Sequence, residues 1–171
     1  AATLLFRAYR VGGAVYAERS VDAGVTWSGE QTVSTEAEGN APGVPGAAPT
    51  LNVDQHDHLW CWAHDTDGAA RLFRSQDYGG SWTDVATHAG LRFPRAARQA
   101  NRTVVVGHDG DELRFYSSDD DGVTLTALSG LTLTAPRQLA ALRVDRRDRL
   151  HLVYTNGTSL LHRLLQDALA T

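Results

Sequence analysis

An eight-residue pattern that occurs three times constrains the fold of this chain more than any other feature. The pattern is S-x-D-x-G-x-[ST]-[WL], and its copies begin at Ser20, Ser75 and Ser118. The Ser and Asp side chains can hydrogen-bond turn amides, and the Gly can adopt a positive φ. Each copy is therefore predicted to be a tight turn between two strands. The residues assigned to these turns are Ser20, Asp22, Gly24, Trp27, Ser75, Asp77, Gly79, Trp82, Ser118, Asp120 and Gly122.

A second repeat lies upstream of the turns. Residues 49–59 correspond to residues 137–150, and residues 94–103 are a weaker version of the same segment. Each segment is predicted to form a strand, a tight polar turn and a second strand, after which a third strand leads into the S-x-D-x-G turn. The resulting unit is a four-stranded antiparallel meander, which is the blade of a β-propeller.

These units amount to about three and a half blades in one domain of 171 residues. The first blade lacks its innermost strand and the last lacks its outermost strand. Residues 159–169 have leucines at helical spacing, but alignment with the other repeats favours a strand there. The blades are predicted over residues 1–33, 49–86, 94–128 and 136–171.

An open array of blades is expected to expose two apolar blade faces and unpaired strand edges. Something must cover such surfaces. Self-association, another subunit or further sequence could complete the ring.

The turn pattern resembles the Asp box, or BNR repeat, of sialidase-like β-propeller proteins. The resemblance implies an all-β propeller in which these turns are structural and lie at the blade periphery, away from the ligand-binding mouth. For a sialidase it also implies three arginines, a Tyr nucleophile paired with a Glu, and an Asp general acid. None of these can be assigned here, so no catalytic residue is predicted. Arg10 and Arg137 are retained as candidate carboxylate ligands, with a solvated strand-edge position as the alternative.

The turns between the second and third strands of a blade carry a different set of polar residues. In propellers these turns lie at the mouth, where carboxylates and imidazoles could contact sugar hydroxyls or a divalent cation. The alternative is that tight Asp-Gly turns favour such residues anyway. No metal or cofactor is assigned. The candidate ligand-binding residues are His64, Asp65, Asp67, His108, Asp109 and Asp111.

Composition excludes several functions. A net charge of −4 argues against nucleic acid as a partner, and no apolar run is long enough to insert in a membrane. Cys61 is the single cysteine and is predicted to be a small buried residue in a strand. All 16 basic side chains are Arg, and Lys, Ile and Met are absent, which indicates a G+C-rich genome.

These observations favour a non-enzymatic recognition or assembly module that binds partner proteins or surface glycan. An extracellular or virion-associated protein, such as a phage tail or receptor-binding component, is the specific expectation. The alternative is a fragment of a sialidase-like glycoside hydrolase. Most of the four tryptophans are expected in contacts between blades; they are Trp27, Trp60, Trp62 and Trp82.

Overall fold

The computed structural model describes residues 4–35, 48–65, 68–99, 102–109, 112–134, 138–145, 147, 149–155 and 158–165. Within these residues the chain is all β, with fourteen strands in four antiparallel sheets and no helix. It follows that the described residues include no helix able to cross a membrane. The strands follow chain order in every sheet, so each sheet is an up-and-down meander, the blade architecture expected from the sequence.

Fourteen strands correspond to three and a half four-stranded blades. Blades 1 and 4 have three strands each, and blades 2 and 3 have four. The segment that could have been a helix by its leucine spacing contains a strand, β14, as favoured above. The strands are β1 (Leu5–Val11), β2 (Ala14–Ser20) and β3 (Ser28–Ser34) in blade 1; β4 (Thr50–Val53), β5 (Leu59–His64), β6 (Ala70–Ser75) and β7 (Thr83–His88) in blade 2; β8 (Arg92–Gln99), β9 (Arg102–Asp109), β10 (Glu112–Ser118) and β11 (Thr126–Thr134) in blade 3; β12 (Gln138–Val144), β13 (Leu150–Thr155) and β14 (Leu160–Leu165) in blade 4.

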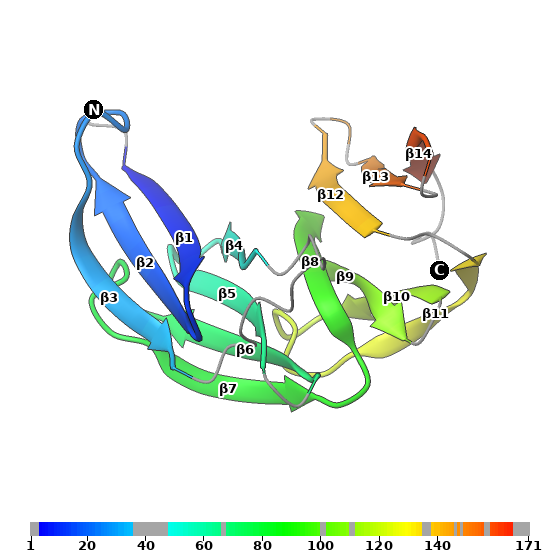
Figure 1. The fold of residues 1–171 in the computed structure, drawn as a ribbon, viewed down its shortest axis with the longest axis horizontal. Coiled ribbons are helices and arrows are strands. Elements are labelled where there is room, and N and C mark those ends of the chain that lie inside the picture. Colours follow the sequence, from blue (N-terminus) through cyan, green and yellow to red (C-terminus); the bar gives the residue numbers. More distant parts are fainter. Residues whose placement is uncertain are drawn as a thin grey trace.

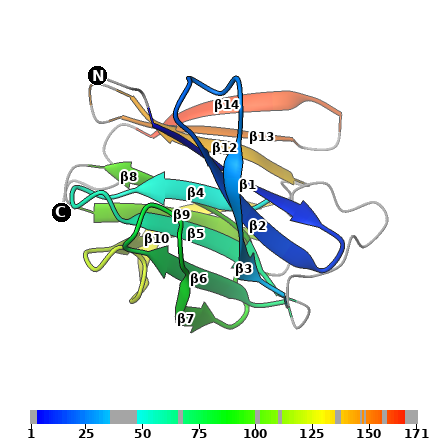
Figure 2. The ribbon, with the colours of Figure 1, turned by 90° about the vertical axis from the view of Figure 1, so that its left-hand side faces the viewer.

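The four blades follow one another around an arc (Figure 1). Contacts run from β1 to β4, from β4 to β8 and from β8 to β12, along the inner side of the arc. Figure 2 shows the arc from the blade 1 end, with β1, β2 and β3 in front. Each blade is therefore flanked by its neighbours in the chain.

Alternation along the strands builds a hydrophobic core at each interface between successive blades. In β5, Trp60 and Trp62 belong to the core shared with blade 3, whereas Cys61 and Ala63 belong to the core shared with blade 1. A third core joins blades 3 and 4. Because both faces of β5 are covered, all six of its residues are buried.

The tryptophans divide between these cores and the periphery. Trp60 and Trp62 lie in the blade 2–blade 3 core, and Trp82 packs, partly buried, against the blade 1–blade 2 core. Trp27 instead contacts Arg7 of its own blade, with the guanidinium carbon 4.4 Å from the ring centroid. Three of the four tryptophans, Trp60, Trp62 and Trp82, therefore lie in contacts between blades, as expected for most of them.

The repeat turns, residues 20–27, 75–82 and 118–125, contain the same hydrogen bonds. In each turn the serine Oγ donates to the aspartate Oδ1 at 2.7–2.8 Å and accepts the glycine amide at 2.7–2.8 Å. The aspartate Oδ1 accepts the amide of the following Thr or Ser at 2.8 Å. The glycine has a φ between 84° and 104°, so an L side chain would be strained there. The Ser, Asp and Gly positions of the pattern are the residues that this turn requires.

The pairing registers relate the blades residue by residue. In blades 1 to 3, the first or second residue of the strand at the second-strand position pairs with the serine that opens the repeat turn. The pairs are Leu5 with Ser20, Leu59 with Ser75, and Thr103 with Ser118. In blade 4 the corresponding pair is Leu150 with Leu165.

The outer faces of the end blades are mixed, which differs from the apolar faces expected from the sequence. The positions of the buried Cys61 and Phe73 of blade 2 are occupied in blade 1 by Arg7 and Glu18. These two side chains form an ion pair, with the Arg7 Nη2 2.5 Å from the Glu18 Oε2. The strand alternation that buries an apolar pair in blade 2 thus presents a charged pair at the open side of blade 1.

Blade 4 shows the same replacement on its outer face. His151 and His162 occupy the positions of Trp60 and Leu72, and their facing ring nitrogens lie 3.0 Å apart. Leu160 is nonetheless exposed on this blade. Both open faces therefore combine polar and apolar side chains.

Candidate functional site

One row of side chains crosses three blades at the rim formed by the β5–β6 and β9–β10 turns, here called the mouth rim. Arg10, His64 and His108 occupy the same register position near the ends of β1, β5 and β9. At this position the side chain faces the next blade, as those of Trp62 and Trp60 do two and four residues before His64. His64 and His108 are buried, and Arg10 is half-buried. The repeat therefore aligns three polar side chains along one rim.

A hydrogen bond links Arg10 to His64, and the ring of Phe93 lies against both histidines. The Arg10 Nη2 donates to the His64 carbonyl oxygen at 3.1 Å. The His64 ring centroid lies 4.7 Å from that of Phe93, and the His108 ring meets Phe93 edge-on at 6.0 Å. We call Arg10, His64, Phe93 and His108 the mouth row.

Phe93 was not among the residues singled out from the sequence. It has a φ of 50°, which bulky residues rarely adopt, and the β8–β9 register shifts between Arg92 and Arg95 around it. The signal that could have found it is Pro94, because a proline within a strand marks an edge or a bulge. Strained backbone of this kind clusters at functional sites.

The two described carboxylates of the mouth turns take part in local interactions. The Asp65 Oδ1 accepts the amide of Ala69 at 2.8 Å and so closes its own turn. The Asp109 Oδ2 lies 2.9 Å from the Arg114 Nη1 in a partly exposed ion pair. Burial, and then the charge of Asp109, raise the pKa of Tyr116 above its ordinary value. Asp65 therefore shapes its own turn, and the charge of Asp109 is paired with Arg114.

The remaining candidate residues Asp67, Asp111 and Arg137 lie outside the described residues. Within the part of the chain that the structure describes, no group of three or more His, Cys, Asp or Glu side chains could hold a metal ion. Cys61 is buried, and burial raises the pKa of its thiol to about 12.

On the opposite rim, two further aspartates that the sequence analysis did not single out organise the turns between first and second strands. The Asp54 Oδ1 accepts the amides of His56 and His58 at 2.7 and 2.9 Å, and its Oδ2 accepts the Trp60 Nε1 at 2.9 Å. Burial alone would raise the pKa of Asp54, but these hydrogen bonds outweigh it and leave the pKa below its ordinary value. Asp145 makes the corresponding amide bonds in blade 4. Both residues stand at the same place in the second sequence repeat.

Comparison with known proteins relates this fold to carbohydrate-active propellers. No protein-family model matches the chain. A xyloglucanase of a Paenibacillus species is 28% identical over an aligned length of 165 residues, and the match covers 81% of this chain and 15% of that protein. The NanB sialidase from Streptococcus pneumoniae superposes with a TM-score of 0.68 and 14% identity, over 97% of this chain and 29% of the sialidase. The α-L-arabinofuranosidase Arb93A from Fusarium graminearum superposes with a TM-score of 0.64 and 12% identity, over 96% of this chain and 60% of that enzyme.

These similarities show the fold, a sialidase-like β-propeller. The chain spans less than two thirds of the length of each of these three proteins.

Proposed function

We propose that this chain is a glycan-recognition part of a sialidase-like propeller and that the mouth row contacts the glycan without cleaving it. The observation that carries the proposal is the row itself. Arg10, His64 and His108 come from three successive blades at one register position, and the strained Phe93 joins the two imidazoles.

The chemistry of the row suits a sugar. The half-buried ring of Phe93 offers an apolar surface to the C–H face of a pyranose, and the half-buried guanidinium of Arg10 can hydrogen-bond a hydroxyl. The buried imidazoles of His64 and His108 pack against Phe93 and position its ring. The carboxylates of Asp65 and Asp109 can accept hydrogen bonds from further hydroxyls. A few polar groups around an aromatic surface are typical of small-ligand sites.

The names of the similar proteins support carbohydrate as the ligand class. A xyloglucanase, a sialidase and an arabinofuranosidase all act on glycans, and all three resemble this chain in sequence or fold. The virion role expected from the sequence has no support from these similarities and stays a prediction, as does the extracellular location.

The test is isothermal titration calorimetry of the protein with a xyloglucan oligosaccharide and with sialyllactose. We expect binding of at least one probe with a dissociation constant of about 1 mM or lower. A combined Asp65→Ala and Asp109→Ala variant should fold normally and bind about tenfold more weakly. Asp119→Ala, an exposed residue on the opposite rim, is the matched control. A double variant that keeps full affinity would show that these two carboxylates do not contact the glycan, and Phe93→Ala, which removes the ring of the mouth row, would then have to abolish binding for the proposal to stand.

The alternative proposal is that the chain is a fragment of a glycoside hydrolase, and the 28% identity to a xyloglucanase favours it. Release of reducing sugar from xyloglucan by the purified chain would support the hydrolase and contradict the recognition module. Binding without release would support recognition. Light scattering of the same sample would measure whether copies associate, which stays a prediction.

A further inference from the structure

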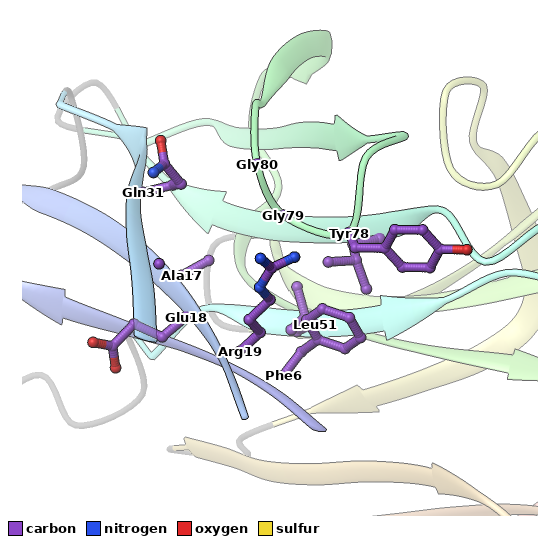
Figure 3. Close-up of a pocket in the computed structure, with 11 residues that line it drawn as sticks. Phe6, Ala17, Glu18, Arg19, Gln31, Leu51, Tyr78, Gly79 and Gly80 are labelled. Atoms are coloured by element: carbon purple, nitrogen blue, oxygen red, sulfur yellow. The ribbon is translucent and has the colours of Figure 1, made fainter. Parts of the chain in front are cut away.

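A cavity of about 100 Å³ lies between blades 1 and 2, on the rim that carries the repeat turns (Figure 3). Phe6, Leu51 and Leu59 give it apolar walls. Tyr78 and the backbone of Gly79, both from the repeat turn of blade 2, border it on one side. The cavity is therefore mostly apolar and lies on the rim opposite the mouth row.

The neighbouring interface explains why this space is open. Between blades 2 and 3 the corresponding cavity has only about 10 Å³. There the side chains of Trp62 and Leu72 press on the repeat turn of blade 3, and a Cβ at Gly122 would lie 2.4 Å from Trp62 and 3.2 Å from Leu72.

Two small residues replace these side chains in blade 1. By register, Ala8 stands at the position of Trp62 and Ala17 at the position of Leu72. A Cβ at Gly79, the counterpart of Gly122, would meet only Leu59 within 4 Å among the described residues, at 3.5 Å. The cavity is thus the volume that an indole and an isobutyl group fill at the next interface.

One cation borders this apolar space. Arg19 is exposed, and it makes no hydrogen bond or ion pair with any residue that the structure describes. Figure 3 shows its guanidinium between Phe6 and the turn at Gly79, whereas Glu18 points away. Glu18 pairs with Arg7, so it does not neutralise Arg19. A guanidinium of this kind is suited to bidentate binding of a carboxylate.

We propose that this cavity binds a small monocarboxylate with an apolar ring, with the ring in the space beside Ala17 and the carboxylate on the Arg19 guanidinium. An enclosed cavity of about 150 Å³ can hold benzene. The space beside Ala17 is smaller, at about 100 Å³, but it opens to solvent, so one ring can enter it part-way. The proposal does not depend on glycan binding, because the two sites lie on opposite rims.

Three probes separate the contributions of ring and charge. Phenylacetate has both, benzyl alcohol has the ring alone, and acetate has the charge alone. Each probe is titrated into the protein, and the NMR chemical shifts of Gly79 and its neighbours report its binding. Phenylacetate should bind about tenfold more tightly than benzyl alcohol or acetate. Failure of phenylacetate to shift these signals at millimolar concentration would overturn the proposal.

Two variants test the assigned residues. Ala17→Leu installs the side chain present at the next interface and should abolish phenylacetate binding while leaving the protein folded. Arg19→Gln should weaken phenylacetate to the level of benzyl alcohol and leave benzyl alcohol unchanged. Arg163→Gln, an exposed arginine in β14, is the matched control and should change neither affinity. Unchanged phenylacetate affinity in Ala17→Leu would place the probe elsewhere, and unchanged affinity in Arg19→Gln would refute the carboxylate contact.

Discussion

The two rims of this propeller arc are built on different principles. On one rim, three repeat turns form nearly the same hydrogen bonds, with donors and acceptors that lie within each turn. On the mouth rim, equivalent positions hold different residues, Arg10 in one blade and histidines in the next two. Those residues make contacts that cross from one blade to another.

The difference indicates that the rim of repeat turns serves the fold, whereas the mouth rim is the candidate site. A turn that satisfies its own hydrogen bonds can recur with little change, because these hydrogen bonds do not require the neighbouring blade. A rim whose residues vary and meet across blades can form a site specific to this chain. Repetition therefore marks the scaffold, and the unequal mouth rim marks the candidate site.

The largest expected effect tests whether the repeat turns are truly independent of their neighbours. Gly122→Ala should lower the free energy of unfolding by about 2–5 kcal/mol, since a positive φ of 104° and a clash with the buried Trp62 act together. Gly24→Ala should cost only about 1–2 kcal/mol, because its φ is also positive but the nearest side-chain atoms would lie at 3.6 and 3.7 Å. Urea unfolding of both variants measures the difference. Equal losses would mean that the blade 3 turn is as independent as that of blade 1.

A prediction of intermediate size concerns the loss of thermal stability at low pH. Hydrogen bonds from the Thr26 hydroxyl and amide hold the pKa of Asp22 at about 2, and those from Ser81 do the same for Asp77. Both values lie below the ordinary 3.8, so these carboxylates stabilise the fold fully above that pH and lose their contribution as the pH falls from 3.8 towards 2. The thermal midpoint should drop across this window.

The matched variant separates these two turns from other acid-sensitive groups. Asp22→Asn combined with Asp77→Asn should have a lower thermal midpoint at pH 5 but a flatter pH profile below pH 4. Asp119→Asn should keep the steep profile. A double variant as steep as the parent would assign the acid dependence to other carboxylates.

Much of the fold could be predicted because its signals are local. The Ser, Asp and Gly of each repeat turn interact with one another, so eight residues suffice to indicate the turn. Strand alternation then places Trp60 and Trp62 on one face of β5. The outer faces were less predictable, since the charged pair of Arg7 and Glu18 stands out only once the register aligns it with Cys61 and Phe73.

The candidate site was only partly accessible from sequence. The repeat placed His64 and His108 in equivalent turns, but the sequence analysis did not place Arg10 at the same register position. Pro94 marks the irregular strand beside Phe93, but the contacts of Phe93 with His64 and His108 from other strands are not encoded in any local pattern. Likewise, the cavity beside Ala17 becomes apparent only when the interface between blades 1 and 2 is compared with the filled interface between blades 2 and 3.

The smallest expected effect tests whether the mouth rim stores strain. Phe93→Ala and Phe93→Gly both remove the ring from between His64 and His108, so both should weaken a glycan probe that binds the mouth row by a similar factor. They differ only in backbone preference, because glycine adopts a φ of 50° without the cost of about 1 kcal/mol that alanine incurs. Phe93→Gly should therefore be the more stable variant by that amount in urea unfolding. If the two are equally stable, the ring and not a strained backbone distinguishes this rim from the repeat turns. If only the alanine variant loses probe binding, the backbone and not the ring forms the contact surface.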